Sequence, residues 1–189
     1  MSRPIVLILG SSGFIGQAIQ RELNAKYDLI SVDLNPNAFN EASSIAHHIV
    51  DQGNPDQVEG LLTALKPYAD QLAGVIHLTA YYDFRNKADK RYTQLEKTFP
   101  QLLEGLDALL PAGTPILHSS SMAAMEPTEP GRPLLASSPR IGSWAYPQHK
   151  LRMERIIESL DLNRPMAELV LAGVYSDRAE LVPLYQQIE

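Results

Sequence analysis

The sequence predicts an α/β fold in which a doubly wound parallel sheet carries helices on both faces. Short apolar segments bounded by turn residues alternate along the chain with segments whose apolar residues recur at helical spacing. In addition, the first apolar segment leads through a glycine-rich turn directly into an amphipathic segment. This alternation is typical of a parallel sheet, because each crossover between neighbouring strands places a helix over one face.

Six strands and four helices are expected, and their succession predicts one sheet with the strand order 3-2-1-4-5-6. The strands are expected at residues 5–9, 29–33, 45–50, 74–78, 115–119 and 168–172. The helices are expected at residues 14–24, at 55–65, somewhere within 86–110, and at 146–160. In such a sheet a ligand binds at the carboxyl ends of the strands, where the strand order reverses.

Prolines modify this pattern at two places. Residues 126–143 contain four prolines, which exclude a continuous helix or a central strand and predict a loop that can close over a site. Pro100 predicts either a kink in the third helix or a helix that starts near Thr98. The apolar residues around it recur at helical spacing and belong either to the core or to a dimer interface. They are Leu95, Phe99, Leu102, Leu103, Leu106 and Leu110.

Composition excludes several classes of protein. A chain of 189 residues with 44% hydrophobic content is expected to form one compact domain, and no apolar run is long enough to span a membrane. We therefore expect a cytoplasmic protein. The net charge of −6 argues against nucleic acid as a partner. The absence of cysteine excludes thiolate chemistry, and the histidines lack a common ligand spacing, so no metal site is predicted.

A glycine turn, Gly10-Ser11-Ser12-Gly13-Phe14-Ile15-Gly16, joins the first strand to the first helix. Gly10 permits a tight turn, Gly13 allows a pyrophosphate to approach the backbone, and Gly16 allows close packing of the helix on the strand. The N–H groups at the helix start favour an anion. A loop that only requires positive φ is the simpler alternative. The residues expected to hold a dinucleotide here are Gly10, Ser12, Gly13, Phe14, Ile15 and Gly16.

Asp33 closes the second strand, 23 residues after Gly10. A carboxylate at this position accepts hydrogen bonds from the ribose hydroxyls of adenosine and repels a 2′-phosphate. Residues 34–37 contain neither Arg nor Lys to bind such a phosphate. The sequence therefore favours NAD over NADP, and the alternative is an aspartate that only starts a turn.

Tyr146 and Lys150 are four residues apart, which places them on one face of a helix. A free tyrosine has a pKa of about 10, and a neighbouring ammonium group stabilises the phenolate, which can then act as a general base. The fifth strand ends in Ser119-Ser120-Ser121, whose hydroxyls can orient a substrate oxygen at the same edge of the sheet. Alone, such a Tyr–Lys spacing also occurs in ordinary solvated helices.

Taken in this order, the motifs resemble the extended short-chain dehydrogenase/reductase family, which includes NAD-dependent epimerases and dehydratases. The resemblance rests on the glycine turn, Asp33, the segment His77-Leu78-Thr79-Ala80, the serine run and the Tyr146–Lys150 pair. It covers essentially the whole chain. It implies a Rossmann fold and NAD as the cofactor.

The resemblance also implies a role for each matched residue. Tyr146 corresponds to the acid/base, Lys150 to the residue that lowers its pKa and holds the nicotinamide ribose, and Ser121, among three serines, to the residue that binds the substrate oxygen. The remaining cofactor-binding residues implied are Asp51 and Gln52, beside the adenine, and Leu78, Thr79 and Ala80, along the dinucleotide.

The chain departs from the family pattern at three places. Ala124-Met125-Glu126 replaces a Val-Tyr-Gly element, which removes an aromatic wall that the family often places beside the substrate. Glu96 is the nearest equivalent of an asparagine that supports the catalytic lysine through water, so a proton relay at that position is not expected. Met122-Ala123 stands where family dehydratases have Asp-Glu, which disfavours dehydration.

The sequence leaves two main functions open. The first is an NAD-dependent epimerase or dehydrogenase that acts on a hydroxyl or keto group of a sugar-like or small hydroxylated substrate. The second is an NAD-binding module without turnover, because family members continue into a substrate lobe whereas only residues 177–189 follow the last expected strand region. We accordingly expect a truncated nucleotide-binding lobe. The family further implies a homodimer through the helices near 86–110 and 146–160. A structural fragment that binds no nucleotide is the least favoured interpretation.

Overall fold

One parallel sheet organises the structure, a computed structural model that describes residues 3–35, 44–82 and 89–174. Its strand order is β3-β2-β1-β4-β5-β6, and all neighbouring strands are parallel. The strands are β1 (Ile5–Leu9), β2 (Asp28–Asp33), β3 (Ala46–Ile49), β4 (Leu72–His77), β5 (Ile116–Ser121) and β6 (Met166–Leu171). The predicted doubly wound sheet with order 3-2-1-4-5-6 is confirmed.

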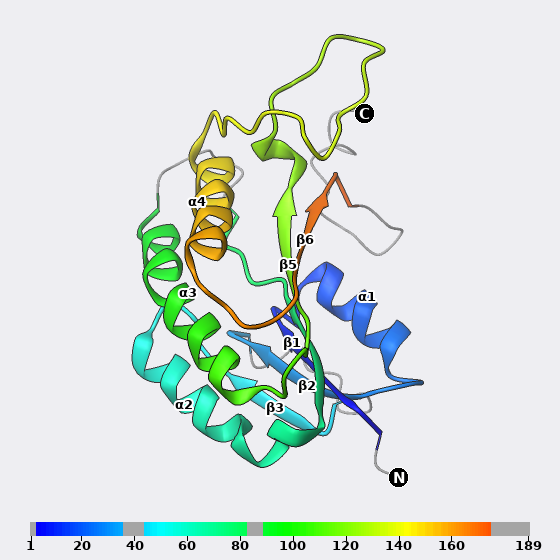
Figure 1. Cartoon of the computed structure of the whole chain (residues 1–189), viewed down its shortest axis with the longest axis vertical. Coiled ribbons are helices and arrows are strands. Elements are labelled where there is room, and N and C mark those ends of the chain that lie inside the picture. The colour runs from blue at the N-terminus through cyan, green and yellow to red at the C-terminus, as the bar shows by residue number, and fades with distance from the viewer. Residues whose placement is uncertain (1–2, 36–43, 83–88, 175–189) are drawn as a thin grey trace.

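Helices cover both faces of this sheet, as predicted. The longer helices are α1 (Phe14–Leu23), α2 (Pro55–Leu65), α3 (Lys90–Leu109) and α4 (Ala145–Ser159). Two short 3₁₀ helices, η2 (Lys66–Gln71) and η3 (Met122–Ala124), follow α2 and β5. Figure 1 shows α1 on one side of the sheet and α2, α3 and α4 together on the other.

Strand β1 explains why the core has two sides. All five of its residues are buried, and successive side chains of a strand point to opposite faces. Ile5, Leu7 and Leu9 belong to the larger apolar cluster, which includes residues of α2, α3 and α4. Val6 and Ile8 belong to the smaller cluster, with apolar residues of α1. A strand buried on both faces therefore reads as one continuous apolar run.

Helix α3 runs without interruption through Pro100, so the predicted start near Thr98 is wrong. Asp89 caps the true start, where its carboxylate accepts a hydrogen bond from the backbone N–H of Arg91 at 2.8 Å. Pro100 has no backbone N–H to donate to the carbonyl of Glu96, four residues earlier, so the helix lacks one hydrogen bond there.

The apolar face of α3 belongs to the core. Of the two places that the sequence left open for these residues, the core or a dimer interface, the structure shows the core. Phe99, Leu102, Leu103, Leu106 and Leu110 are all buried in the larger cluster. This burial, with flanking contacts to α2 and α4, holds the helix together around the proline. No helix in the described ranges is long and apolar enough to cross a membrane.

The proline-rich segment 126–143 forms an irregular loop, as predicted, and its two ends are fastened together. Met125 and Arg140 form an antiparallel bridge, and the N–H of Glu126 donates to the carbonyl of Pro139 at 2.7 Å. Arg140 also forms ion pairs with Glu154 of α4 and, at 3.7 Å, with Glu168 of β6. The loop therefore starts and ends beside the helix that carries Tyr146 and Lys150.

Candidate active site in a two-part cleft

A cleft follows the carboxyl edge of the sheet, at the switch between β1 and β4. It has two adjoining halves of about 420 Å³ each, which share Gly10, Gly13, Leu78 and Ala80 as walls. Among the other predicted residues, the first half, called the Asp33 half, is lined by Ser12, Asp33, Asp51, Gln52 and Thr79. The second, called the Tyr146 half, is lined by Phe14, Ile15, Gly16, Ser121, Tyr146 and Lys150. The structure thus brings every residue predicted for the site to one cleft.

Two glycines are required by the shape of the turn at the centre of this cleft. Gly10 has a φ of +84°, and a Cβ there would lie 2.8 Å from the backbone nitrogen of Thr79. A Cβ at Gly16 would lie 2.6 Å from the carbonyl oxygen of Ser11 and closer still to that of Gly10. The contacts are with backbone, which cannot rotate away. The turn is therefore wedged between β4 and α1, with its backbone exposed to the cleft.

A Gly16→Ala variant should be destabilised by about 1–3 kcal/mol and should lose affinity for NAD, because the new methyl group must displace the backbone of the turn. The matched control is Gly60→Ala in α2. A Cβ at Gly60 meets nothing within 4 Å, so this change should stabilise the protein by about 0.5–1 kcal/mol. Urea unfolding of both variants measures the difference. Equal effects of the two changes would contradict the described packing of the turn.

Asp33 is held at the mouth of the cleft by backbone donors. Its Oδ2 accepts a hydrogen bond from the N–H of Ser12 at 2.9 Å, and its Oδ1 accepts one from the N–H of Asn35 at 3.0 Å. A carboxylate has about four acceptor positions, so each oxygen retains capacity for a ligand hydroxyl. The bond from Ser12 also ties the end of β2 to the glycine turn.

A buried chain of polar side chains runs beneath the cleft. Gln52 donates through Nε2 to the hydroxyl of Thr79 at 2.6 Å, and its Oε1 lies 3.2 Å from Nε2 of His77. Nδ1 of His77 lies 3.0 Å from Nδ1 of His118. Burial lowers the pKa of His77 to about 3 and that of His118 well below its usual value, so both rings are neutral at pH 7. The two histidines are therefore neutral core residues.

Lys150 is almost fully buried at the base of the Tyr146 half, where its Nζ donates to the carbonyl of Ser119 at 2.7 Å. Burial lowers the pKa of Lys150 to about 8, against an opposing effect from the carboxylate of Glu154. Its Nζ lies 6.0 Å from the centre of the Tyr146 ring. The ammonium group is therefore still charged at neutral pH, within one helical turn of the tyrosine.

The pKa of Tyr146 is raised in the structure, whereas the sequence analysis expected it to be lowered. Burial is the main cause, and the nearby Tyr82 and Tyr92 add to it. A hydrogen bond with the side chain of Ser121 opposes the rise. Because Lys150 is turned toward the carbonyl of Ser119, its charge does not offset the desolvation of the phenol. The structure does bring Ser121 and Tyr146 together in the same half of the cleft.

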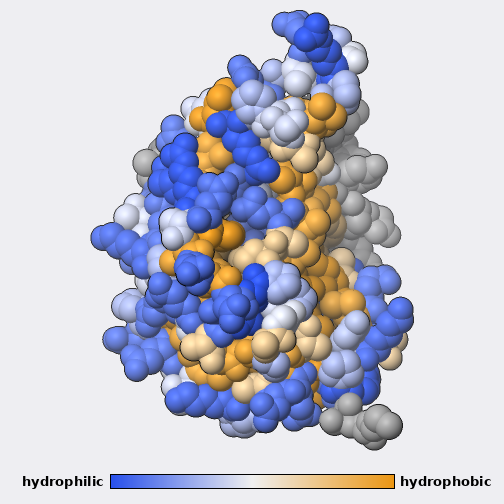
Figure 2. Space-filling model, in the orientation of Figure 1, coloured by the Kyte–Doolittle hydropathy of each residue, from blue (hydrophilic) through white to orange (hydrophobic). Residues whose placement is uncertain are grey.

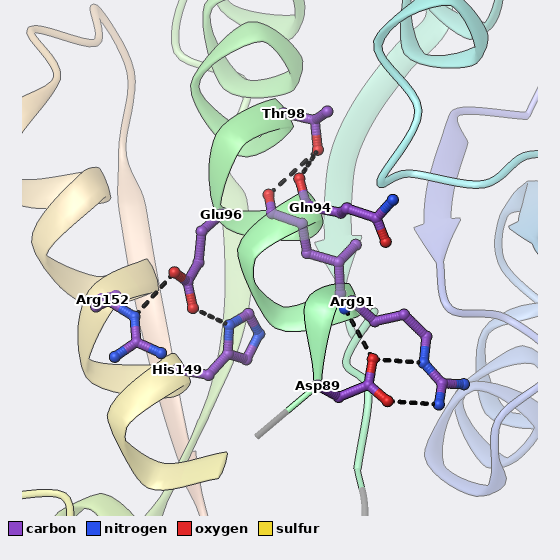
Figure 3. Close-up of polar contacts among 8 residues, drawn as sticks. Asp89, Arg91, Gln94, Glu96, Thr98, His149 and Arg152 are labelled. Atoms are coloured by element: carbon purple, nitrogen blue, oxygen red, sulfur yellow. Dashed lines mark hydrogen bonds and ion pairs between the residues drawn. The ribbon is translucent and has the colours of Figure 1, made fainter. Parts of the chain in front are cut away.

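Glu96 joins α3 to α4 rather than supporting Lys150. Its two carboxylate oxygens lie 2.8 Å from Nδ1 of His149 and 2.8 Å from Nε of Arg152, as Figure 3 shows. Burial raises the pKa of this carboxyl, but the two partners outweigh it and the net shift is downward. Glu96 thus anchors the face of α4 that neighbours Tyr146 and Lys150. The distribution of charged residues along the chain does not indicate this pairing.

Arg91 belongs to a basic stretch of the sequence, residues 85–97, a pattern that is typical of a solvated helix face. It is exposed, yet it lines the Asp33 half. Its guanidinium carbon lies 3.6 Å from the centre of the Tyr81 ring, and its nitrogens contact the carboxylate of Asp89 at 2.8 and 2.9 Å (Figure 3). The Asp89 cap therefore aims the arginine at the cleft. Residues 85 and 87 of the same basic stretch lie outside the described residues.

A second ion cluster was missed by the sequence analysis because its members are far apart in the chain. The hydroxyl of Ser120 donates to the buried carboxylate of Glu154, which also pairs with Arg140. These contacts connect β5, α4 and the proline-rich loop just behind Lys150. Within the described ranges, no group of three or more His, Asp or Glu side chains is placed to hold a metal ion.

Known structures share this fold. The chain is similar to the enzyme WbmG of Bordetella bronchiseptica in complex with NAD and UDP (17% identity, TM-score 0.73, 98% of this chain and 58% of that one). It is also similar to UDP-glucose 4-epimerase of Thermotoga maritima (18%, 0.74, 93% and 58%) and to UDP-glucuronic acid 4-epimerase of Bacillus cereus (19%, 0.70, 94% and 60%). The chain thus spans less than two thirds of these proteins.

Sequence comparison identifies the family. No curated protein matches the chain significantly. The sequence profile of the NAD dependent epimerase/dehydratase family, however, matches residues 6–182. This range contains every residue predicted for the cleft, and the family's cofactor is the NAD that the sequence analysis expected. The chain therefore belongs to the NAD dependent epimerase/dehydratase family.

Proposed function

We propose that the cleft binds NAD and serves hydride transfer at a hydroxyl-bearing carbon of a sugar-like substrate, in a reaction of the epimerase or dehydrogenase type. The observation that carries the proposal is the meeting of Ser121, Tyr146 and Lys150 in one half of the cleft. The other half presents Asp33 beside the same glycine turn. In this proposal the site of hydride transfer therefore adjoins the site that holds the rest of the dinucleotide.

The cleft has the features that a dinucleotide requires. The backbone at Gly13 is open, since a Cβ there would meet only the carbonyl oxygen of Gly10, at 3.4 Å. The pyrophosphate would lie against this backbone and the start of α1, whose N–H groups favour an anion. Asp33 would accept hydrogen bonds from the adenosine ribose, and Lys150 would hold the nicotinamide ribose.

In this proposal each residue of the Tyr146 half has one chemical task. Bound NAD supplies the hydride acceptor. The Tyr146 phenolate removes the proton of the substrate hydroxyl while the hydride leaves the same carbon, which becomes a carbonyl. Ser121 hydrogen-bonds to the reacting oxygen. Return of the hydride to the opposite face of the carbonyl carbon, with return of the proton to its oxygen, would complete an epimerisation, and release of the keto product would complete an oxidation.

Charge accounts for the need for Lys150. Burial raises the pKa of Tyr146, so the phenolate requires a positive charge nearby. The buried Lys150 ammonium lies one helical turn after Tyr146 on the same face of α4. Its pKa of about 8 leaves it charged at pH 7. We infer that the amine turns from the Ser119 carbonyl toward the ribose and the phenol when NAD binds.

The proposal is tested in two stages. Calorimetry with NAD measures cofactor binding, and NMR of nucleotide sugars incubated with the chain and NAD detects epimers or keto products. We expect NAD binding and the conversion of a hydroxylated sugar. Binding without any conversion over a broad sugar panel would contradict the catalytic part and would favour an NAD-binding module. Absence of NAD binding would contradict the whole proposal.

NAD should bind at least about tenfold more tightly than NADP, because the 2′-phosphate would lie against the Asp33 carboxylate. Asp33→Ser should reduce this preference, since it removes the charge but keeps a hydroxyl. Calorimetric titrations with both cofactors measure the ratio for each protein. The cofactor preference would have another origin if the ratio did not change in the variant.

A further inference from the structure

Three aromatic rings meet at the Tyr146 half of the cleft. Tyr82 follows β4, Trp144 immediately precedes α4, and Tyr146 lies in the first turn of that helix. The ring centres are 4.6 Å apart for Tyr82 and Tyr146, 6.0 Å for Tyr82 and Trp144, and 5.7 Å for Trp144 and Tyr146. The first two pairs have edge-to-face geometry, which is favourable for aromatic rings. Tyr82 is thus fixed in orientation by both neighbours.

Tyr82 is also accessible from the cleft. It lines the Tyr146 half and keeps 41% of its surface exposed, although its ring packs against that of Tyr146. A large aromatic ring that stays exposed beside a catalytic hydroxyl offers an apolar surface to a ligand. Other walls of the same half, Phe14 and Val174, are 36% and 44% exposed. This end of the cleft therefore combines apolar surface with the hydroxyls of Ser121 and Tyr146.

The aromatic ring of Tyr82 stands in this half of the cleft in place of a wall from the segment after β5. The segment after β5, where the sequence analysis noted the loss of an aromatic wall, is turned away from the cleft. Ala124 is fully buried, and Met125 is 7% exposed and bridged to Arg140. Tyr82, in the segment after β4, lines this half of the cleft instead, and Trp144 packs against its ring.

We propose that Tyr82, supported by Trp144, binds the C–H face of a pyranose ring whose hydroxyl reaches Ser121 and Tyr146. The proposal rests on the proposed function and adds Tyr82 as a residue that holds and selects the substrate. A pyranose has an apolar C–H face and a polar rim, which matches an aromatic ring beside two hydroxyl donors. An open-chain hydroxy acid has no such face and would gain less from the ring.

Saturation-transfer NMR with UDP-glucose on the NAD-saturated chain tests this proposal, because it reports weak contacts of glucose and uridine protons separately. We expect saturation of the glucose C–H protons in the wild type. Tyr82→Phe keeps the ring and should keep the signal. Tyr82→Leu keeps apolar volume without the ring and should weaken the glucose signal about threefold or more, with uridine signals and NAD affinity retained.

Two results would overturn the proposal. One is a glucose signal in Tyr82→Leu equal to that of the wild type. The other is wild-type protein that binds NAD by calorimetry but shows no saturation of glucose protons, which would leave the NAD site intact and remove only the sugar platform. If Tyr82 merely positioned Tyr146, Tyr82→Leu would slow turnover without changing the glucose signal, so the two roles are separable.

Discussion

Tyr146→Phe should lower the rate of sugar conversion by about 10²- to 10⁴-fold and leave NAD affinity nearly unchanged. The phenol oxygen is the atom that takes the substrate proton in the proposed reaction, and phenylalanine lacks it. The ring itself remains, so the packing against Tyr82 and Trp144 at 4.6 and 5.7 Å is conserved. A loss of turnover with intact cofactor binding therefore isolates the proton transfer.

Steady-state kinetics and NAD calorimetry on the same preparation measure both quantities. Lys150→Met provides the contrast, because it should impair turnover and NAD binding together. Turnover by Tyr146→Phe at the wild-type rate would show that another group is the base. A parallel loss of NAD affinity in Tyr146→Phe would show that the tyrosine acts mainly in cofactor binding.

Lys150 should make the free energy of unfolding of the protein increase as the pH rises above about 8. Its pKa is about 8 in the folded protein, below the reference value of 10.5 that applies when the chain is unfolded. Between these values the unfolded state binds more protons, so wild-type stability should rise with pH relative to Lys150→Met, which cannot titrate. The free energy of unfolding of the wild type should rise by about 3 kcal/mol relative to the variant. This rise should begin near pH 8 and be nearly complete at pH 10.5.

Urea unfolding of both proteins at a series of pH values from 7 to 10.5 measures this difference. Subtraction of the two curves removes the titration of the tyrosines and other lysines that both proteins share. A constant difference across the range would mean that the Lys150 amine has an ordinary pKa and is solvated. A fall with pH would mean that the folded state holds its proton more tightly than the unfolded chain.

The fold was predictable because its signals are local. Five consecutive apolar residues in β1, followed by the glycine turn and an amphipathic α1, identify a β–α unit without any tertiary information. Parallel topology then follows from the repeated alternation. The start of α3 could not be predicted in the same way. Pro100 is unfavourable locally, and only the burial of Phe99, Leu102 and Leu103 against other elements outweighs it.

The site was predictable to the extent that its residues follow strand ends or share a helix face. Asp33, Ser121 and the Tyr146–Lys150 pair satisfy this condition and line the cleft. The environments of these groups were not predictable. The raised pKa of Tyr146 results from burial among residues of several elements, and the anchoring of α4 by Glu96 depends on a contact across 53 positions of the chain.

A crystal structure of the chain with NAD tests the central claim most directly, namely that the two halves of the cleft form one dinucleotide site. We predict that the adenosine ribose lies within hydrogen-bonding distance of the Asp33 carboxylate and that the pyrophosphate rests on the backbone at Gly13. The nicotinamide ribose should lie within reach of Lys150, with the nicotinamide beside Tyr146. NAD bound in the reverse direction, or outside the cleft, would contradict this account.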